Sequence, residues 1–130
     1  MAEVNKVTKA IIPVAGLGTR MLPASKAIPK ELLPIVNKPI IQYVVEEAIN
    51  AGINQIIFIT NDSKVAIEKH FDKNFFLESS LKKNKKKKLL ESVKDIIPKN
   101  ITISSIKQKK PLGLGDAIYK ASKFIRNEPF

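Results

Sequence analysis

The sequence predicts an α/β domain with a mostly parallel sheet and helices on both of its faces. Two apolar runs of strand length, residues 9–15 and 55–60, are separated by a helical pattern with short connections. This order favours parallel pairing, because a crossover helix returns the chain to the same end of the sheet. A glycine loop follows the first run, at the end of the sheet where such folds bind ligands.

The first two strands and the helix between them are the clearest elements. Both strands are rich in apolar residues, as is typical of strands buried on both faces. Apolar side chains recur at helical spacing over residues 40–49, which predicts an amphipathic helix. Pro39 suits its first turn, and Gly52 suits the position where it ends. The apolar face of that helix is expected to comprise Ile40, Ile41, Val44, Val45, Ala48 and Ile49.

The second half of the chain continues the alternation. Polar residues 61–63 are suited to cap a helix, and the side chains of this helix that we expect to face the core are Val65, Ala66, Ile67 and Phe71. Residues 72–98 suggest one or two helices interrupted by lysines. Apolar and polar side chains alternate over residues 101–106, as in a third strand. Residues 114–125 favour a helix whose start is marked by Gly113, Gly115 and Asp116.

The composition excludes several function classes. The chain has 130 residues, a length typical of a single domain. It contains no cysteine, and this excludes a disulfide framework, thiolate zinc sites and thiol catalysis. Residues 1–9 are polar and lack the apolar centre of a signal peptide, and no apolar run approaches the ~20 residues that span a bilayer. We therefore expect a cytoplasmic chain with no membrane partner.

The net charge of +11 is concentrated in one run, in which six of the seven residues 82–88 are lysine. No aromatic residue that could stack on bases lies within this run, and no groove-reading motif surrounds it. We interpret it as a solvated helix or loop, and a nucleic-acid partner is not favoured. Binding to a polyanion such as RNA and a merely lysine-rich background composition remain the alternatives.

The loop after the first strand has the composition of a phosphate cradle. Gly16 and Gly18 bracket Leu17 and let the backbone turn close to a ligand, and Thr19 and Arg20 follow at once. Backbone N–H groups beside a guanidinium suit phosphate. The spacing matches neither the dinucleotide fingerprint nor the P-loop of nucleotidases, and a plain glycine turn is the alternative interpretation.

A proline-rich segment continues this loop. Four prolines between residues 23 and 39 predict a long, stiff loop, since each restrains its own φ and the residue before it. Long irregular loops in compact domains commonly serve a ligand. This one carries Lys26, Lys30 and Glu31, a set of cations and a carboxylate that suits a nucleotide.

These motifs resemble those of a known family. Residues 16–20, followed by Pro23 and then Pro29-Lys30, resemble the signature of the sugar-1-phosphate nucleotidyltransferases. The fuller strings of residues 23–34 and 37–43 are similar to the bacterial UTP–glucose-1-phosphate uridylyltransferases, also called UDP-glucose pyrophosphorylases. The resemblance implies a Rossmann-like nucleotidyltransferase fold with three α/β/α layers, of which residues 1–130 would be the N-terminal nucleotide-binding part.

The resemblance also implies an enzyme that transfers UMP from UTP to glucose 1-phosphate, giving UDP-glucose and pyrophosphate. Arg20 and Lys30 would be the catalytic residues, with Arg20 on the β- and γ-phosphates and Lys30 near the α-phosphate. The residues implied to bind the nucleotide are Ala15, Gly16, Leu17, Gly18, Thr19, Glu31, Gln108 and Gly113. A glutamine amide can donate and accept, so Gln108 could pair with a pyrimidine edge.

The cofactor and assembly are expectations of the same kind. The resemblance implies Mg²⁺, with aspartate ligands expected beyond Phe130 and none within this chain, and a homo-oligomeric full-length form. We therefore expect the 130-residue chain alone to make no UDP-glucose at a useful rate. A non-catalytic UTP-binding fragment or module, lacking the metal and sugar sites, is the alternative.

The remaining polar residues are interpreted structurally. His70, the only histidine, is expected on the surface or at a helix end. Asp62, Asp95 and Asp116 are expected to be helix caps or solvated charges. Glu46 and its neighbour Glu47 point in different directions on a helix, which argues against a catalytic carboxylate pair.

Overall fold

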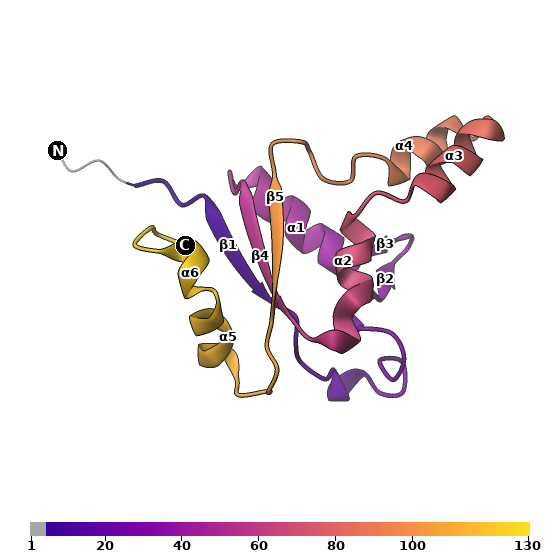
Figure 1. The fold of residues 1–130 in the computed structure, drawn as a ribbon. Helices are drawn as coiled ribbons and strands as arrows, with labels where there is room; N and C mark the ends of the chain where they lie inside the picture. The colour runs from indigo at the N-terminus through magenta and orange to yellow at the C-terminus, as the bar shows by residue number, and fades with distance from the viewer. Residues whose placement is uncertain (1–4) are drawn as a thin grey trace.

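The computed structural model describes residues 5–130 and contains a three-layer α/β/α arrangement (Figure 1). Its main sheet consists of the parallel strands β1 (Lys9–Pro13), β4 (Gln55–Thr60) and β5 (Thr102–Lys107), in the order β1-β4-β5. The helices are α1 (Ile40–Asn50), α2 (Val65–Phe71), α3 (Phe75–Lys83), α4 (Lys87–Val93), α5 (Leu114–Lys120) and α6 (Ser122–Ile125). The predicted fold class is confirmed.

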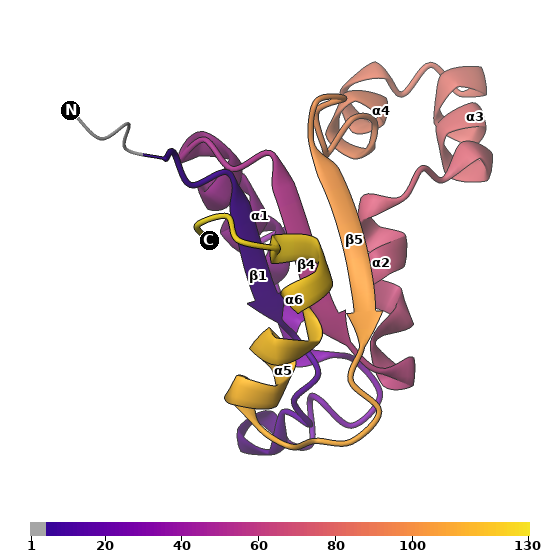
Figure 2. The same cartoon turned by 60° about the vertical axis from the view of Figure 1, so that its left-hand side comes forward.

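The central strand β4 organises both faces of the sheet. Its side chains alternate, so that Ile56 and Phe58 lie in one apolar cluster while Ile57 and Ile59 lie in the other. The first cluster includes Val14 and residues of α1 and α2, and the second includes residues of α5 and α6. Figures 1 and 2 show α1 and α2 on one side of the sheet and α5 and α6 on the other.

The register of the sheet brings the carboxyl ends of its strands together. Ile12 of β1 pairs with Phe58 of β4, and Phe58 pairs with Ser105 of β5. The ladder continues one step past β1, where the Val14 amide donates to the Ile59 carbonyl at 2.8 Å. The loops after β1, β4 and β5 therefore start at the same edge of the sheet, and they have to form the ligand site if there is one.

The loop over residues 16–39 is less irregular than predicted. It contains two short 3₁₀ helices, η1 (Thr19–Met21) and η2 (Lys30–Leu32), and a small hairpin of β2 (Pro34–Ile35) and β3 (Lys38–Pro39). The prolines still set its limits, because Pro29 precedes η2 and Pro39 is the N-cap of α1 in extended conformation. The segment is thus stiffened by local structure as well as by proline.

Two predicted helical faces are only partly right. In α1, Ile41 and Val45 are buried, whereas Ile40 is 39% and Val44 is 41% exposed. The sheet therefore covers a narrower face of this helix than the apolar spacing in the sequence predicts. In α2, Ile67 is buried and Phe71 stacks on Phe58 with ring centroids 5.6 Å apart, while Val65 and Ala66 are exposed.

The predicted helix over residues 114–125 is divided. Ala121 ends α5 with an N–H bond to the Ile118 carbonyl, three residues back, and α6 starts at the next residue. Neither glycine nor proline marks this break. Ala121 is fully buried against β4, and the tightened turn lets both short helices pack on the same face of the sheet.

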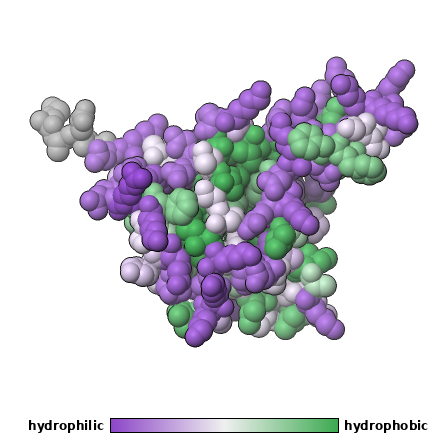
Figure 3. All heavy atoms as spheres, in the orientation of Figure 1, coloured by the Kyte–Doolittle hydropathy of each residue, from purple (hydrophilic) through white to green (hydrophobic). Residues whose placement is uncertain are grey.

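Helices α3 and α4 form an arm beyond the sheet. Neither helix contains a buried residue, and they lie at the projecting end of the molecule in Figure 1. The lysine run ends α3 at Lys83, crosses the connection and starts α4 at Lys87. Figure 3 shows hydrophilic side chains at this end of the molecule, beside a smaller patch of hydrophobic ones. The prediction of one or two helices with a solvated lysine run is confirmed.

Candidate functional site

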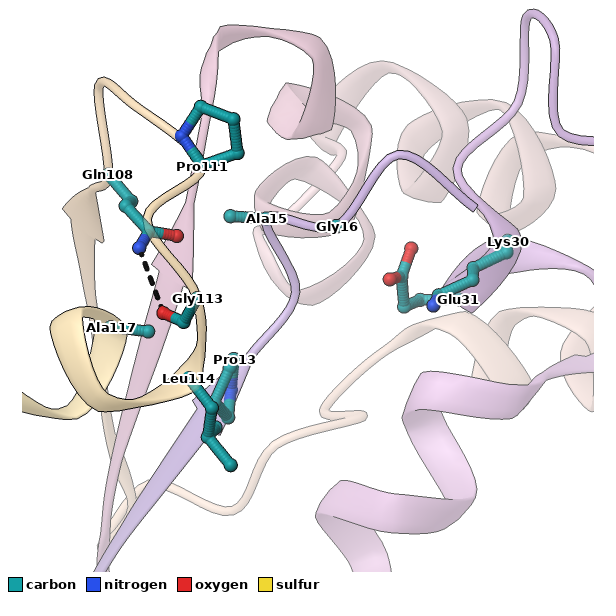
Figure 4. Close-up of a pocket in the computed structure, with 10 residues that line it drawn as sticks. All are labelled: Pro13, Ala15, Gly16, Lys30, Glu31, Gln108, Pro111, Gly113, Leu114 and Ala117. Atoms are coloured by element: carbon teal, nitrogen blue, oxygen red, sulfur yellow. Dashed lines mark hydrogen bonds between the residues drawn. The ribbon is translucent and has the colours of Figure 1, made fainter. Parts of the chain in front are cut away.

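A pocket of about 310 Å³ lies at the carboxyl ends of β1 and β5. Three segments far apart in the sequence form it: the loop after β1, the 3₁₀ helix η2, and the loop from β5 to α5 (Figure 4). Its lining consists of Pro13, Ala15, Gly16, Lys30, Glu31, Gln108, Pro111, Gly113, Leu114 and Ala117. Six of the ten residues predicted to form the site are therefore brought together.

The glycine loop packs directly on the side chain of Lys30. Gly18 has φ 66° and ψ 32°, in the left-handed region that favours glycine, and a Cβ placed on it would lie 3.3 Å from Lys30 Cδ. A Cβ on Gly16 would lie 3.9 Å from Lys30 Nζ. The stem of Lys30 thus passes Gly18 and delivers its ammonium group beside Gly16, at the rim of the pocket.

A buried ion pair joins η2 to η3 (Asp62–Lys64), the 3₁₀ helix that follows β4. Lys64 Nζ donates to Glu31 Oε2 at 2.9 Å, and the two side chains are only 5% and 12% exposed. Removing one partner of such a buried pair is strongly destabilising, because the other charge is left buried and unpaired. The pair fixes the backbone of η2, and therefore also the neighbouring Lys30, relative to the sheet.

Asn61, the first residue after β4, joins two of the loops. Its Nδ2 donates to the Ala15 carbonyl at 2.7 Å, and its Oδ1 accepts from the Ser63 amide at 2.9 Å. The prediction that residues 61–63 would cap the following element is confirmed for Asn61, which is the N-cap of η3 (Asp62–Lys64). The same side chain closes the glycine loop onto the sheet.

Gln108 lies at the end of β5 and is only 7% exposed. Its backbone N–H donates to the Thr60 carbonyl at 2.7 Å. Its side-chain Nε2 donates to the Gly113 carbonyl at 3.2 Å and to Asp116 Oδ2 at 2.8 Å. Figure 4 shows the amide oxygen on the opposite side, toward Ala15 and the pocket.

The other four predicted residues lie outside this lining. Leu17 is exposed and borders two adjoining cavities. Gly18 lies within the glycine loop, where its carbonyl accepts a hydrogen bond from Ser25 Oγ at 2.6 Å. Thr19 and Arg20 belong to η1 and are exposed, and Arg20 makes no ion pair with any other residue in the range 5–130.

Sequence reasoning missed three polar residues of this region. Asp116 was expected to be a cap or a solvated charge, but its carboxylate accepts from Gln108. Asn61 could have been found, because it follows a strand whose carboxyl end shares an edge with the glycine loop. Lys64 gave no signal, since nothing nearby distinguishes it from the 22 other basic residues of the chain.

The remaining carboxylates and the histidine agree better with expectation. Asp95 is exposed. Asp62 is exposed and pairs with Lys107, and this hydrogen bond holds the pKa of Asp62 below its usual value. His70 lies in the last turn of α2, where its Nε2 is 2.8 Å from Gln42 Oε1 and partial burial lowers its pKa.

The described part of the chain contains neither a cluster of metal ligands nor a membrane-spanning helix. Within residues 5–130, no group of three or more His, Cys, Asp or Glu side chains comes close enough to hold a metal ion. In that same range, every helix is too short or too polar to cross a bilayer.

Residues 9–130 of the chain match the family model described as nucleotidyl transferase. The chain is 55% identical over 130 residues to the UTP–glucose-1-phosphate uridylyltransferase of Escherichia coli strain K12, and the match covers 99% of this chain and 43% of the relative. It is 56% identical over 122 residues to the Haemophilus influenzae enzyme of the same name, covering 94% and 41%.

Solved structures agree with these matches. The UTP-bound UGPase from Acinetobacter baumannii superimposes with a TM-score of 0.94 at 48% identity, covering 96% of this chain and 44% of that one. A UDP-glucose pyrophosphorylase complexed with UDP-glucose gives a TM-score of 0.78 at 42% identity, covering 96% and 44%. The chain thus spans less than half the length of the relatives it matches. It belongs to the nucleotidyl transferase family.

Proposed function

We propose that residues 1–130 are the N-terminal nucleotide-binding part of a UTP–glucose-1-phosphate uridylyltransferase. The reaction would transfer UMP from UTP to glucose 1-phosphate and release pyrophosphate. The observation that carries the proposal is the pocket where the glycine loop, Lys30 and Gln108 meet. Relatives that bear this enzyme's name support it at 55% and 56% identity. Because the match covers 43% of the first relative's length, we propose, on the basis of this likeness, that the complete reaction and both substrates are those of the full-length enzyme.

The uridine would be held at the Gln108 end of the pocket. The Gln108 amide oxygen points into the pocket and can accept from the imide N–H of uracil. Gly113 and Ala15 line the same end. Glu31 uses Oε2 in its pair with Lys64, which leaves Oε1 to accept from the uridine. This arrangement suits uridine better than adenosine, because the adenine edge presents no N–H between two carbonyls.

The phosphates would lie along the glycine loop. Lys30 places its ammonium group beside Gly16, where it would neutralise charge near the α-phosphate. Arg20 is on η1, outside the pocket lining, and its proposed role is to stabilise the negative charge of the departing pyrophosphate. Leu17, Gly18 and Thr19 would complete the cradle. Such a site accelerates transfer by positioning and charge neutralisation, without a protein nucleophile.

Mg²⁺ remains part of the proposal through the resemblance. The residues in the range 5–130 do not fit the ion by themselves, because no three carboxylate or imidazole groups converge. When bound, a divalent cation would neutralise triphosphate charge. A cytoplasmic location is likewise proposed, supported by the absence of cysteine, and homo-oligomeric assembly rests on the resemblance alone.

Isothermal titration of the purified chain with UTP and with ATP tests the proposed nucleotide site. We expect UTP to bind roughly tenfold more tightly than ATP, because a mismatched edge leaves buried polar groups unpaired at a cost of at least about 1 kcal/mol. Gln108→Ala should remove most of this preference. Equal affinity of the wild-type chain for both nucleotides would contradict the proposed role of Gln108.

A non-catalytic UTP-binding module is the second candidate, because the pocket formed by the glycine loop, Lys30 and Gln108 suits nucleotide binding in either case. The purified chain can be incubated with UTP, glucose 1-phosphate and Mg²⁺ while pyrophosphate release is followed. We expect binding without turnover. A rate in the usual enzyme range of ~1 to ~1,000 per second would show that these 130 residues suffice for catalysis.

A further inference from the structure

The orientation of the Gln108 amide is determined by its two acceptors. Nε2 uses both of its hydrogens, one toward the Gly113 carbonyl and one toward Asp116 Oδ2. A carbonyl and a carboxylate can only accept, so the NH₂ end of the amide has to face them. The oxygen therefore faces the pocket and offers an acceptor there, as Figure 4 shows.

Asp116 is the stronger of the two constraints. Its bond to Nε2 is 2.8 Å long, compared with 3.2 Å for the Gly113 carbonyl, which also accepts from the Ala117 amide. A hydrogen bond to a carboxylate is stronger than one to a neutral acceptor. Asp116 lies in the first turn of α5, where a negative charge is favoured by the helix N-terminus.

We infer that Asp116 is a positioning residue that makes this pocket selective for a base with an imide N–H. The inference rests on the proposed binding of UTP. Uracil presents a ring N–H between two carbonyls, whereas cytosine presents an unprotonated ring nitrogen at the same position. With the amide oxygen held toward the pocket, uracil gains a hydrogen bond, and cytosine places two acceptors against each other.

Asp116→Asn is the sharpest perturbation because it preserves the shape of the side chain. An asparagine can turn either its oxygen or its NH₂ group toward Gln108, so the orientation of the Gln108 amide is no longer enforced. Asp62→Asn is the matched control. It removes the same charge from an exposed carboxylate that borders a neighbouring cavity and pairs with Lys107.

The experiment measures the Kd values of the chain for UTP and for CTP by isothermal titration. We expect the CTP-to-UTP ratio of Kd to be about ten or more in the wild type and to fall at least about fivefold in Asp116→Asn, the scale of one hydrogen bond. Asp62→Asn should keep the wild-type ratio. In a Gln108→Ala background, Asp116→Asn should change the ratio no further.

A second readout needs no ligand. In the wild-type chain, the Nε2 protons of Gln108 should exchange with solvent more slowly than in Asp116→Asn, as measured from the side-chain amide signals by NMR. Equal exchange rates overturn the inference, even if the variant binds nucleotide poorly.

The outcomes separate the two proposals. If the wild type binds UTP and Asp116→Asn keeps its CTP-to-UTP ratio, the role of Asp116 is wrong and the UTP site stands. If the ratio falls equally in Asp62→Asn, the effect is one of charge and the inference is also wrong. If the wild type does not bind UTP, the proposed function and the inference both fail.

Discussion

Replacing Gly18 by alanine should disturb both the backbone and the position of Lys30. Gly18 has φ 66°, and alanine in this left-handed region costs about 1–2 kcal/mol. The new Cβ would also lie 3.3 Å from Lys30 Cδ and 3.3 Å from Ser25 Cβ, closer than most such contacts in proteins. The stem of Lys30 would have to shift, and its ammonium group would move away from Gly16.

The expected loss of stability follows from the cost of placing alanine in the left-handed backbone conformation of Gly18. A loss of about 1–2 kcal/mol in the free energy of unfolding lowers the Tm of a domain this size by roughly 4–8 °C. The affinity for UTP should fall in addition, by about tenfold if the Lys30 contact with phosphate is lost, since a charged hydrogen bond contributes about 1.5 kcal/mol or more. Urea denaturation and isothermal titration measure the two effects separately.

Two other glycines provide matched controls. Gly115 lies in α5, where an added Cβ meets no atom within 4 Å, and alanine should leave stability unchanged or raise it by up to about 1 kcal/mol. Gly113 has φ 96° with open space around it, so alanine there should show backbone strain without a clash. If Gly18→Ala is as stable as Gly115→Ala, the argument from the left-handed backbone is refuted. Unchanged UTP affinity refutes the link to Lys30.

Three further predictions follow from the ionisable residues. Lys30→Ala should weaken UTP binding about tenfold, and Arg20→Ala should weaken it less because Arg20 lies outside the pocket lining, as titration can measure. Lys64→Ala should lower the free energy of unfolding by about 3 kcal/mol, because it leaves the Glu31 carboxylate buried without a partner. The stability of the wild type should fall as the pH drops below 6.5, since burial lowers the pKa of His70 and the unfolded state then binds more protons; urea denaturation at pH 7.5 and 5.5 measures this fall.

Each of these predictions has its own contradicting result. Equal losses of UTP affinity in Lys30→Ala and Arg20→Ala would show that Arg20 contributes as much as Lys30 to binding UTP before transfer, contrary to its position outside the pocket lining. A Lys64→Ala variant as stable as the wild type would show that Glu31 reaches solvent. For the histidine, the comparison is His70→Gln, which cannot titrate; an identical pH dependence in the variant would assign the fall to other groups.

Strands and site loops could be predicted because their signals are local. Residues 55–60 are uniformly apolar, and a strand buried on both faces requires that pattern. The glycine loop and Gln108 each follow a strand, and parallel pairing places both at one edge. Lys30 is expected near them because Pro29-Lys30 matches the signature of the sugar-1-phosphate nucleotidyltransferases, whereas the prolines by themselves predict only a stiff loop.

The features that could not be predicted depend on contacts between distant segments. The division of the last helix at Ala121 arises from packing on β4, and no residue type marks it. The burial of Lys64 depends on a carboxylate 33 residues away in the chain. The role of Asp116 becomes visible only when the Gln108 amide lies within hydrogen-bond distance, because an aspartate in a first helical turn otherwise reads as a cap.

The α3–α4 arm divides the chain between the two halves of the pocket. The glycine loop and Lys30 precede the arm, and Gln108 and Gly113 follow it. Because neither helix of the arm has a buried residue, its local opening costs little free energy, and the lysines at its turn offer trypsin a first cleavage site. Such a cut would leave two fragments held by the pairing of β4 with β5 and by the packing of α5 and α6 on the sheet. Nucleotide binding by the nicked protein would then report on the combined strength of these non-covalent contacts.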